Sequence, residues 1–193
     1  MTGFKHLHFG GAVVVVALVA GQGCAAVTFQ DAKMLGKGKL ELTPTVALAG
    51  VSGEGESEAL GPLVGANLSL GLTDKVDLIG GYHGFSGSIG PKISLVQDRA
   101  ALLVPVTIGV GLLQVGPAAV FSVPLGNGVT FNPGAKVVWT NCDGCELLLG
   151  ASAGLSVPFG NRVVLRPEIG MLKIQGEPGM IWAFGVGLSL RSR

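Results

Sequence analysis

Two stretches of the sequence nearly repeat each other: SVPLGNGVTFNPGAKV at Ser122–Val137 and SVPFGNRVVLRPEIGM at Ser156–Met171. Each places an apolar residue at nearly every second position and carries Gly-Asn between its two alternating runs. Alternation with a period of two predicts β-strands, and Gly-Asn between two such runs predicts a tight hairpin turn. Because this sequence pattern occurs twice, we predict that the fold repeats a β-hairpin as its structural unit.

The same alternation continues through most of the remaining chain, and outside the N-terminal stretch no segment has a convincing helical period. We therefore predict an all-β, antiparallel, up-and-down barrel of about ten strands, with eight strands as the alternative. Four prolines inside the expected strands each remove a hydrogen-bond donor, and we interpret them as bulge or bend sites. These prolines are Pro44, Pro105, Pro133 and Pro167. The expected strands with the clearest bounds lie at 39–48, 60–72, 76–85, 91–97, 100–110 and 180–191.

The two faces of the expected strands differ in kind. One face carries large apolar side chains on every strand, whereas the other carries mostly Gly, Ser, Ala and Thr with a few charges. In a soluble, lipocalin-like ligand-binding barrel the apolar face would point inward, and in a transmembrane barrel it would point to lipid. Because the small polar face suits a crowded lumen better than a water-facing exterior, the pattern favours the transmembrane barrel.

The connections between the expected strands fall into two alternating classes. Tight turns (TDK, DR, GNG and GN) follow the even-numbered strands, longer loops (AGVSGEGESEA, TNCDGCE and KIQGEPG) follow the first, seventh and ninth, and SGSIG is intermediate. Short turns at one end and longer loops at the other are typical of outer-membrane barrels. Aromatic residues near both strand ends predict two interfacial girdles. These residues are Tyr82, Phe131, Trp139, Phe159 and Trp182.

The N-terminal stretch has the features of an export signal. Lys5 precedes the apolar run FGGAVVVVALVAG, which is too short to span a bilayer as a helix. The following VAGQGC resembles the lipobox of bacterial lipoproteins, and this resemblance implies that Cys24 becomes the lipidated first residue; cleavage after Ala25 or Ala26 is the alternative. We therefore divide the chain into a signal peptide at 1–23, a periplasmic N-terminal linker at 24–36 and a barrel at 37–193.

The charge content of the chain argues against nucleic acid as a partner. Only 13% of the 193 residues are charged, and the formal net charge is +1. A soluble domain usually carries about 25% charged residues. A near-neutral chain offers no basic surface for a phosphate backbone.

Over the expected barrel the chain resembles the small bacterial outer-membrane β-barrel proteins. The resemblance is carried by LSLGLTDKVDLIGGY, SVPFGNRVVLRPEIG and FGVGLSLR, whereas the final RSR departs from the terminal aromatic residue of that group. It implies a bacterial outer-membrane location with both termini in the periplasm, outer-membrane lipids as partners, and a non-enzymatic role that is structural or contacts a surface partner through extracellular loops. A narrow passive pore is an alternative.

Two motifs invite a chemical interpretation. Cys142 and Cys145 form CDGC in a loop, which in an exported protein predicts a small disulfide rather than a metal site. His83 with Ser86 and Ser88 invites comparison with lipid A deacylases, so a lipid A-modifying enzyme is a further alternative. The deacylase spacing is not matched, and we place the two serines in a loop. We therefore expect no catalytic residue, no cofactor and no metal site.

Several charged residues fall on the face expected to line the lumen. Charges in a narrow interior must be paired and hydrogen-bonded. They predict either a stabilising plug of salt bridges or a selectivity constriction in a thin pore. Closure of the first strand on the last would bring Glu41 beside Arg191 at one mouth. The predicted lumen charges are Lys39, Glu41, Asp77, Lys136, Arg162, Arg166, Glu168 and Arg191.

Overall fold

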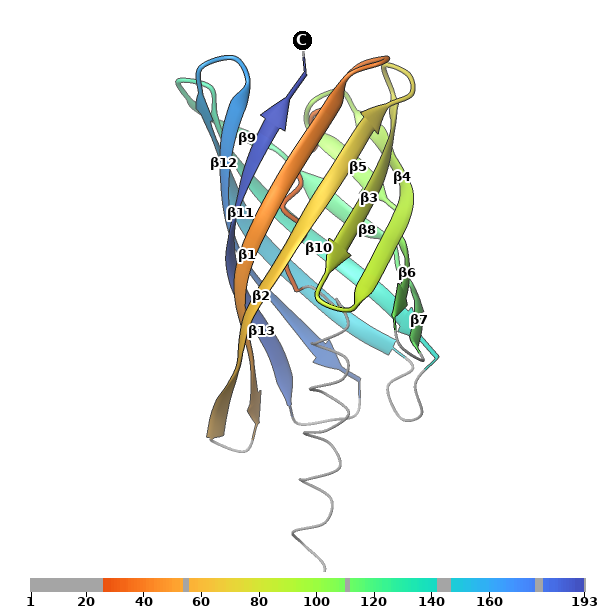
Figure 1. The fold of residues 1–193 in the computed structure, drawn as a ribbon, viewed down its shortest axis with the longest axis vertical. Helices are drawn as coiled ribbons and strands as arrows, with labels where there is room; N and C mark the ends of the chain where they lie inside the picture. The colour runs from red at the N-terminus through yellow and green to blue at the C-terminus, as the bar shows by residue number, and fades with distance from the viewer. Residues whose placement is uncertain (1–25, 54–55, 110–111, 142–146, 176–178, 193) are drawn as a thin grey trace, which may run out of the picture.

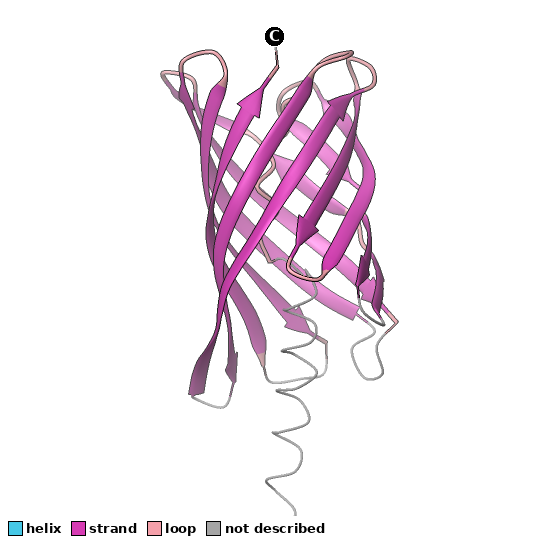
Figure 2. Ribbon diagram, in the orientation of Figure 1, coloured by secondary structure: helices cyan, strands magenta, loops and turns pink. Residues whose placement is uncertain are grey.

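A computed structural model describes residues 26–53, 56–109, 112–141, 147–175 and 179–192, and its strands form one closed antiparallel barrel (Figure 1). The barrel has ten strand positions, and strands make up its whole wall (Figure 2). Two positions are interrupted, because β5 and β6 both pair with β4, and β7, β8 and β9 all pair with β10. The strands are β1 (Leu40–Gly53), β2 (Glu56–Gly71), β3 (Val76–His83), β4 (Ser86–Val96), β5 (Ala100–Leu103), β6 (Val106–Gly109), β7 (Leu112–Val115), β8 (Ala118–Phe121), β9 (Val123–Gly126), β10 (Val129–Thr140), β11 (Leu147–Phe159), β12 (Val163–Ile174) and β13 (Met180–Arg191).

The barrel closes between its first and last strands. β1 and β13 pair antiparallel from Glu41↔Arg191 to Ser52↔Met180. On its other side β1 pairs with β2, and the ladder continues around the wall back to β13. The predicted closure and the predicted count of ten strands are confirmed. Closure of β1 on β13 removes the open edges that the first and last strands would otherwise present to lipid, where unpaired backbone groups are costly.

The large apolar side chains point away from the barrel axis. On β1, Leu42 and Val46 are 45% and 55% exposed, whereas Thr43 and Thr45 beside them are buried. The soluble, lipocalin-like alternative is therefore wrong, because the apolar face covers the outside of the barrel. Other exposed apolar side chains on the wall include Leu40, Leu48, Val64, Leu68, Ile108, Leu149, Ile169, Phe184 and Leu188.

The repeated hairpins are both present in the structure. β9 and β10 are joined by Asn127 and Gly128, whose φ values are 51° and 78°. Positive φ at both central residues is the reason why two-residue hairpins favour Asn-Gly. The second copy, β11–β12, turns through residues 160–162 with Gly160 at a φ of 69°. These two turns lie at one end of the barrel with those at 72–75 and 97–99, and we call it the turn end; the opposite end is the loop end.

Two connections at the loop end, β1–β2 and β3–β4, are shorter than the sequence predicts. β1 extends to Gly53 and β2 begins at Glu56, so most of the expected loop AGVSGEGESEA is strand. The expected loop SGSIG is also strand, because β4 begins at Ser86 and pairs with β3. The sequence does not predict strand for these residues because they lack the large apolar side chains at every second position that mark the other strands. The β1–β2 hairpin projects beyond β3, whose pairing with β2 stops at Gly65 (Figure 1).

The four prolines coincide with interruptions in the ladder rather than with bulges. Pro105 lies in the break between β5 and β6. Pro44, Pro133 and Pro167 each lie beside a gap in pairing with one neighbouring strand, and the register is the same on both sides of the gap. A gap of this kind accommodates the missing N–H. The register shifts lie elsewhere, between Ala49 and Gly50 for example.

Some predicted features lie outside the described residues. They are the signal peptide at 1–23, Cys24, Cys142 and Cys145. Within the described part of the chain, no helix has the length and apolar character needed to cross a membrane.

A substitution at Ala153 tests whether the apolar face of the wall contacts lipid. Ala153 lies in the middle of β11 and is paired with Pro133 on one neighbouring strand and with the exposed Ile169 on the other. Ala153→Arg places a cation among acyl chains, at a cost of roughly 2–4 kcal/mol near the bilayer midplane. We expect a clear loss of folding efficiency in lipid vesicles, measured by the heat-dependent shift in gel mobility. Ala153→Leu, which adds similar bulk without charge, should fold like the unaltered protein. Equal folding of both variants would contradict the outward assignment.

Candidate functional site

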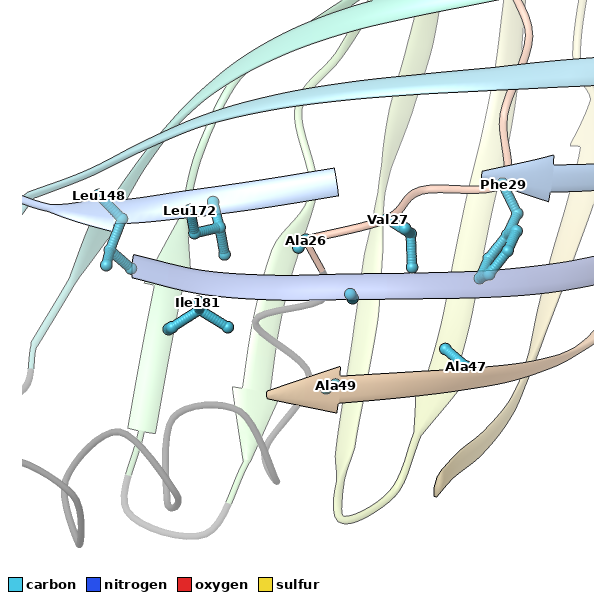
Figure 3. Packing of buried hydrophobic residues seen from close by; sticks show 9 residues of the cluster. Ala26, Val27, Phe29, Ala47, Ala49, Leu148, Leu172 and Ile181 are labelled. Carbon is cyan, nitrogen blue, oxygen red and sulfur yellow. The ribbon is translucent and has the colours of Figure 1, made fainter. Parts of the chain in front are cut away.

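The lumen contains the N-terminal segment of the chain, residues 26–38. Its irregular backbone enters the barrel before β1 begins, and Ala26, Val27, Phe29, Asp31 and Ala32 are all buried. Figure 3 shows Ala26, Val27 and Phe29 inside the barrel, with strands of the wall around them. The sequence predicts a linker over 24–36, whereas in the structure most of residues 26–32 are buried inside the barrel and Lys33 is exposed.

The N-terminal segment runs along the barrel from its loop half to its turn end. The carbonyl of Ala26 lies against Gly170, nearer to the loop end of β12 than to its start. At the other extreme, the N–H of Gly38 donates to the carbonyl of Gly71 at 2.7 Å, beside the turn at 72–75. The segment therefore passes through most of the lumen before the chain turns into β1.

Glycines on three wall strands, β2, β12 and β13, make room for this segment. A Cβ atom at Gly170 would overlap the carbonyl of Ala26, and one at Gly71 would overlap the carbonyl of Gly36. A Cβ atom at Gly185 would collide with the ring of Phe29. The absence of side chains at these positions is what lets a second layer of backbone lie against the strands.

In the loop half of the lumen, the contact between the N-terminal segment and the wall is apolar. Ala26, Val27 and Phe29 form one buried cluster with residues of β1, β11, β12 and β13 (Figure 3). Phe29 is 1% exposed and has a φ of 53°, in the left-handed region that aromatic residues rarely adopt. The wall residues of this apolar collar are Ala47, Ala49, Leu148, Leu172, Ile181 and Ala183.

The backbone of the N-terminal segment is hydrogen-bonded by wall side chains. Glu168 accepts from the N–H of Thr28 at 2.8 Å and from the N–H of Phe29. The N–H of Ala32 donates to Ser122 Oγ at 2.9 Å. These bonds replace those that a strand or helix would supply to a buried backbone.

A buried ionic cluster fills the turn half of the lumen. Asp31 of the segment lies 3.1 Å from Arg166, 3.5 Å from Arg191 and 3.9 Å from Lys92. Glu41 contacts Arg166 at 3.2 Å and also pairs with Arg191. Arg166 is only 2% exposed, so it depends on these partners.

The second part of the cluster joins Lys92 to the segment and to β3. Lys92 lies 3.6 Å from Asp77 and donates to the carbonyl of Lys33 at 2.6 Å. Asp77 in turn accepts from the N–H of Leu35 at 3.2 Å. Its other carboxylate oxygen and one terminal nitrogen of Arg166 are buried without a hydrogen-bond partner.

The structure brings most, but not all, of the predicted lumen charges together. Glu41, Asp77, Arg166 and Glu168 are buried, and Arg191 and Lys136 are partly buried. Lys39 and Arg162 are exposed at the turn end, because Lys39 precedes β1 and Arg162 belongs to a turn. Sequence analysis missed Lys92, although alternation along β4 turns it inward. It also missed Asp31, which no pattern marks because the segment is irregular.

His83 has an amide as its partner. Its Nε2 lies 3.0 Å from Asn67 Oδ1, and Ser86 Oγ donates to the backbone carbonyl of His83 at 3.1 Å. Both Ser86 and Ser88 lie in β4, so the placement of these serines in a loop is wrong. Within the described residues no serine hydroxyl is hydrogen-bonded to the imidazole ring of His83, and this group faces the lumen rather than lipid.

A cavity of about 110 Å³ remains between the N-terminal segment and the wall. It is lined by Val27, Thr28 and Gln30 of the segment and by apolar and polar wall residues such as Leu103 and Lys136. No group of three or more potential metal ligands occurs among the described residues.

The predicted girdle residues lie on the outer face. Tyr82 and Trp139 are 58% and 50% exposed near the loop end, and Trp182 is half-buried because its ring lies over Gly50. Phe131 and Phe159 are exposed toward the turn end.

No protein-family model and no curated protein matches the chain. Among solved structures, an outer-membrane channel from Pseudomonas putida F1 superposes with a TM-score of 0.51 at 10% identity, covering 86% of this chain and 100% of that one. The fold is that of transmembrane β-barrels.

Two other solved structures align over most of their length with lower scores. The translocator domain of the autotransporter NalP from Neisseria meningitidis has a TM-score of 0.48 at 11% identity, covering 97% of this chain and 96% of that one. The attachment invasion locus protein Ail of Yersinia pestis has a TM-score of 0.43 at 12% identity, covering 81% and 99%.

Because Asp31 pairs with three cations of the ionic cluster, we expect its removal to destabilise the packing of the N-terminal segment strongly. Asp31→Ala leaves Arg166 and Lys92 buried with one fewer counterion, at a cost of about 3–5 kcal/mol. We expect the backbone amides of residues 28–32 to exchange with solvent roughly a hundredfold faster or more, measured by hydrogen exchange and mass spectrometry. Lys37→Ala, at an exposed position of the same segment, is the matched control. Unchanged exchange in Asp31→Ala would show that the cluster does not hold the segment.

Proposed function

We propose that this protein is a non-enzymatic barrel of the bacterial outer membrane whose lumen is closed by its own N-terminal segment. The observation that carries the proposal is the set of ion pairs between Asp31 and three wall cations inside the barrel. These pairs connect a segment outside the strand ladder to strands on different sides of the lumen. The protein is then a structural membrane element rather than an open pore.

The outer face supports residence in a bilayer. Half-exposed Leu, Val, Ile and Phe side chains cover the wall, and a water-exposed surface of this extent would be an aggregation hazard. Exposed aromatic residues near both strand ends fit the two interfaces of a membrane. We place the turn end, which also holds the C-terminus (Figure 1), in the periplasm, because short turns face that compartment in outer-membrane barrels.

A narrow pore is the second candidate function. The strand ladder closes without the N-terminal segment, so the wall remains complete if the segment leaves. The vacated lumen would be lined by Glu41, Asp77, Lys92, Arg166 and Arg191. Such a ring of charges is the kind of lining that selects ions.

A surface partner, if the protein has one, would meet the β1–β2 hairpin at the loop end. This hairpin projects past β3, and the outer part of β2 lies beyond the pairing with β3. Gly61, with a φ of 108°, and Pro62 interrupt that free edge, as expected where a strand must avoid unwanted pairing.

Conductance in a planar bilayer distinguishes the closed barrel from the open pore. We expect the unaltered protein to give no steady single-channel current. Asp31→Lys places a fourth cation against Arg166, Arg191 and Lys92, so this variant should show repeated openings. Lys37→Glu, an equal and opposite charge change at an exposed position, should stay silent. Steady current through the unaltered protein would refute closure and favour the narrow pore.

We also propose that Cys24 carries lipid, on the strength of the lipobox-like VAGQGC. Cells grown with radiolabelled palmitate should incorporate label into the unaltered protein, and Cys24→Ser should abolish incorporation. Absence of label from the unaltered protein would show that Cys24 is not lipidated.

A further inference from the structure

The wall holds the N-terminal segment by contacts that resemble those between a binding site and a peptide. The described residues 26–36 belong to no strand, so wall side chains bind much of their backbone. Asn67 donates to the carbonyl of Thr28 at 3.4 Å, and Lys92 donates to the carbonyl of Lys33 at 2.6 Å. Contacts of this kind are available to the backbone of any peptide, whatever its side chains.

The wall has a slot for one aromatic ring. A Cβ atom at Gly185 would lie 2.6 Å from the ring of Phe29, and one at Gly187 would lie 3.4 Å from it. Phe29 itself is 1% exposed. Because β13 carries no side chain at these two positions, a flat ring fits against its backbone.

A second slot accepts a carboxylate. The carboxylate of Asp31 contacts cations from three different strands. Among the described wall residues of the ionic cluster, three cations face two anions, namely Lys92, Arg166 and Arg191 against Glu41 and Asp77. The wall of the cluster therefore has one excess positive charge, which a carboxylate from a bound peptide balances.

The position between the ring and the carboxylate has room around it. Gln30 lines the cavity of about 110 Å³ that remains between the segment and the wall. A side chain at this position is therefore not confined on all sides. The wall selects an aromatic residue and, two positions later, an acidic residue, whereas the residue between them is free to vary.

We propose that the lumen is a binding site for peptides of other chains that carry an aromatic residue, any residue and then an acidic residue. The N-terminal segment occupies this site in cis and is its autoinhibitor. The inference rests on the proposed function, because it takes the lumen to be closed by this segment. A tethered occupant competes at an effective concentration on the order of millimolar, so a peptide from another chain binds well only when the segment is unseated.

Peptide binding to the full chain tests the proposal. A fluorescent synthetic peptide of residues 26–37 is mixed with the Asp31→Lys protein in detergent micelles, and fluorescence anisotropy reports binding. This substitution repels the segment from the wall cations and leaves the wall itself unaltered. We expect saturable binding to the variant, and binding about tenfold weaker or less to the unaltered protein, whose site is occupied. The same peptide built from D-amino acids has equal charge and apolarity, should not bind, and controls for uptake into micelles.

Competition by altered peptides tests the two slots. A peptide with Asp31→Asn should compete about a hundredfold more weakly, because it leaves buried cations without their counterion. A peptide with Phe29→Ala should compete about thirtyfold more weakly. Peptides with Gln30→Ala or with Lys33→Ala, whose side chain is exposed, should stay within about threefold.

Peptides of unrelated sequence test whether the pattern itself is recognised. One keeps only the phenylalanine and the aspartate with one residue between them, and a second has two residues between them. We expect the first to displace the fluorescent peptide and the second to fail. The first should also silence the channel openings of the Asp31→Lys protein in a planar bilayer, because it refills the lumen.

The outcomes separate this inference from the proposed function. Equal binding of the L- and D-peptides, or equal competition by the Asp31→Asn and Lys33→Ala peptides, would overturn the recognition. So would a lack of binding to an Asp31→Lys protein that shows the heat-dependent gel shift and channel openings, and that result would leave the proposed closure intact. If hydrogen exchange shows the segment still seated in Asp31→Lys, the recognition is also overturned, because a slot that accepts lysine does not select a carboxylate. Steady current through the unaltered protein would instead refute the proposed function.

Discussion

Backbone hydrogen bonding is the constraint from which the rest of this structure follows. A strand that faces lipid has no water to satisfy its N–H and C=O groups, so the sheet must close, as it does where β1 meets β13. Closure assigns the large apolar side chains to the outside and leaves the polar and charged side chains facing a narrow lumen. Those charges have little water around them, and each needs a partner within the protein.

The polar groups of the wall do not all find partners within the wall, and the N-terminal segment supplies further ones. Toward the turn end, Asp31 provides an anion for Arg166 and Lys92, and backbone carbonyls and amides of the segment meet further wall side chains. Toward the loop end, Phe29 fills the space over Gly185. Because the segment forms no strand, its removal costs lumen contacts but breaks no pair of the ladder. Barrel integrity and lumen closure are thus separable properties.

The distinctive chemistry of the molecule lies in its lumen rather than in its loops. Among the described residues, most of the stretch expected as the loop 49–59 is strand, and the connection between β3 and β4 at 84–85 is only two residues long. The lumen, in contrast, holds a buried ionic cluster and a threaded segment. A functional account therefore begins with whether the N-terminal segment stays seated in the lumen.

The sequence by itself determined that the fold is all-β, and it favoured ten strands, closure and an apolar face toward lipid over the alternatives of eight strands and a soluble barrel. These follow from period-two alternation and from Gly-Asn turns, which are local signals. It also indicated Glu41, Asp77 and Arg166 as interior charges, because strand alternation assigns a face to each residue. Only the tertiary structure placed residues 26–38 in the lumen and paired Asp31 with Arg166, across a long separation in sequence. An irregular segment has no period to read, and its position is decided by space and charge that exist only after the barrel has closed.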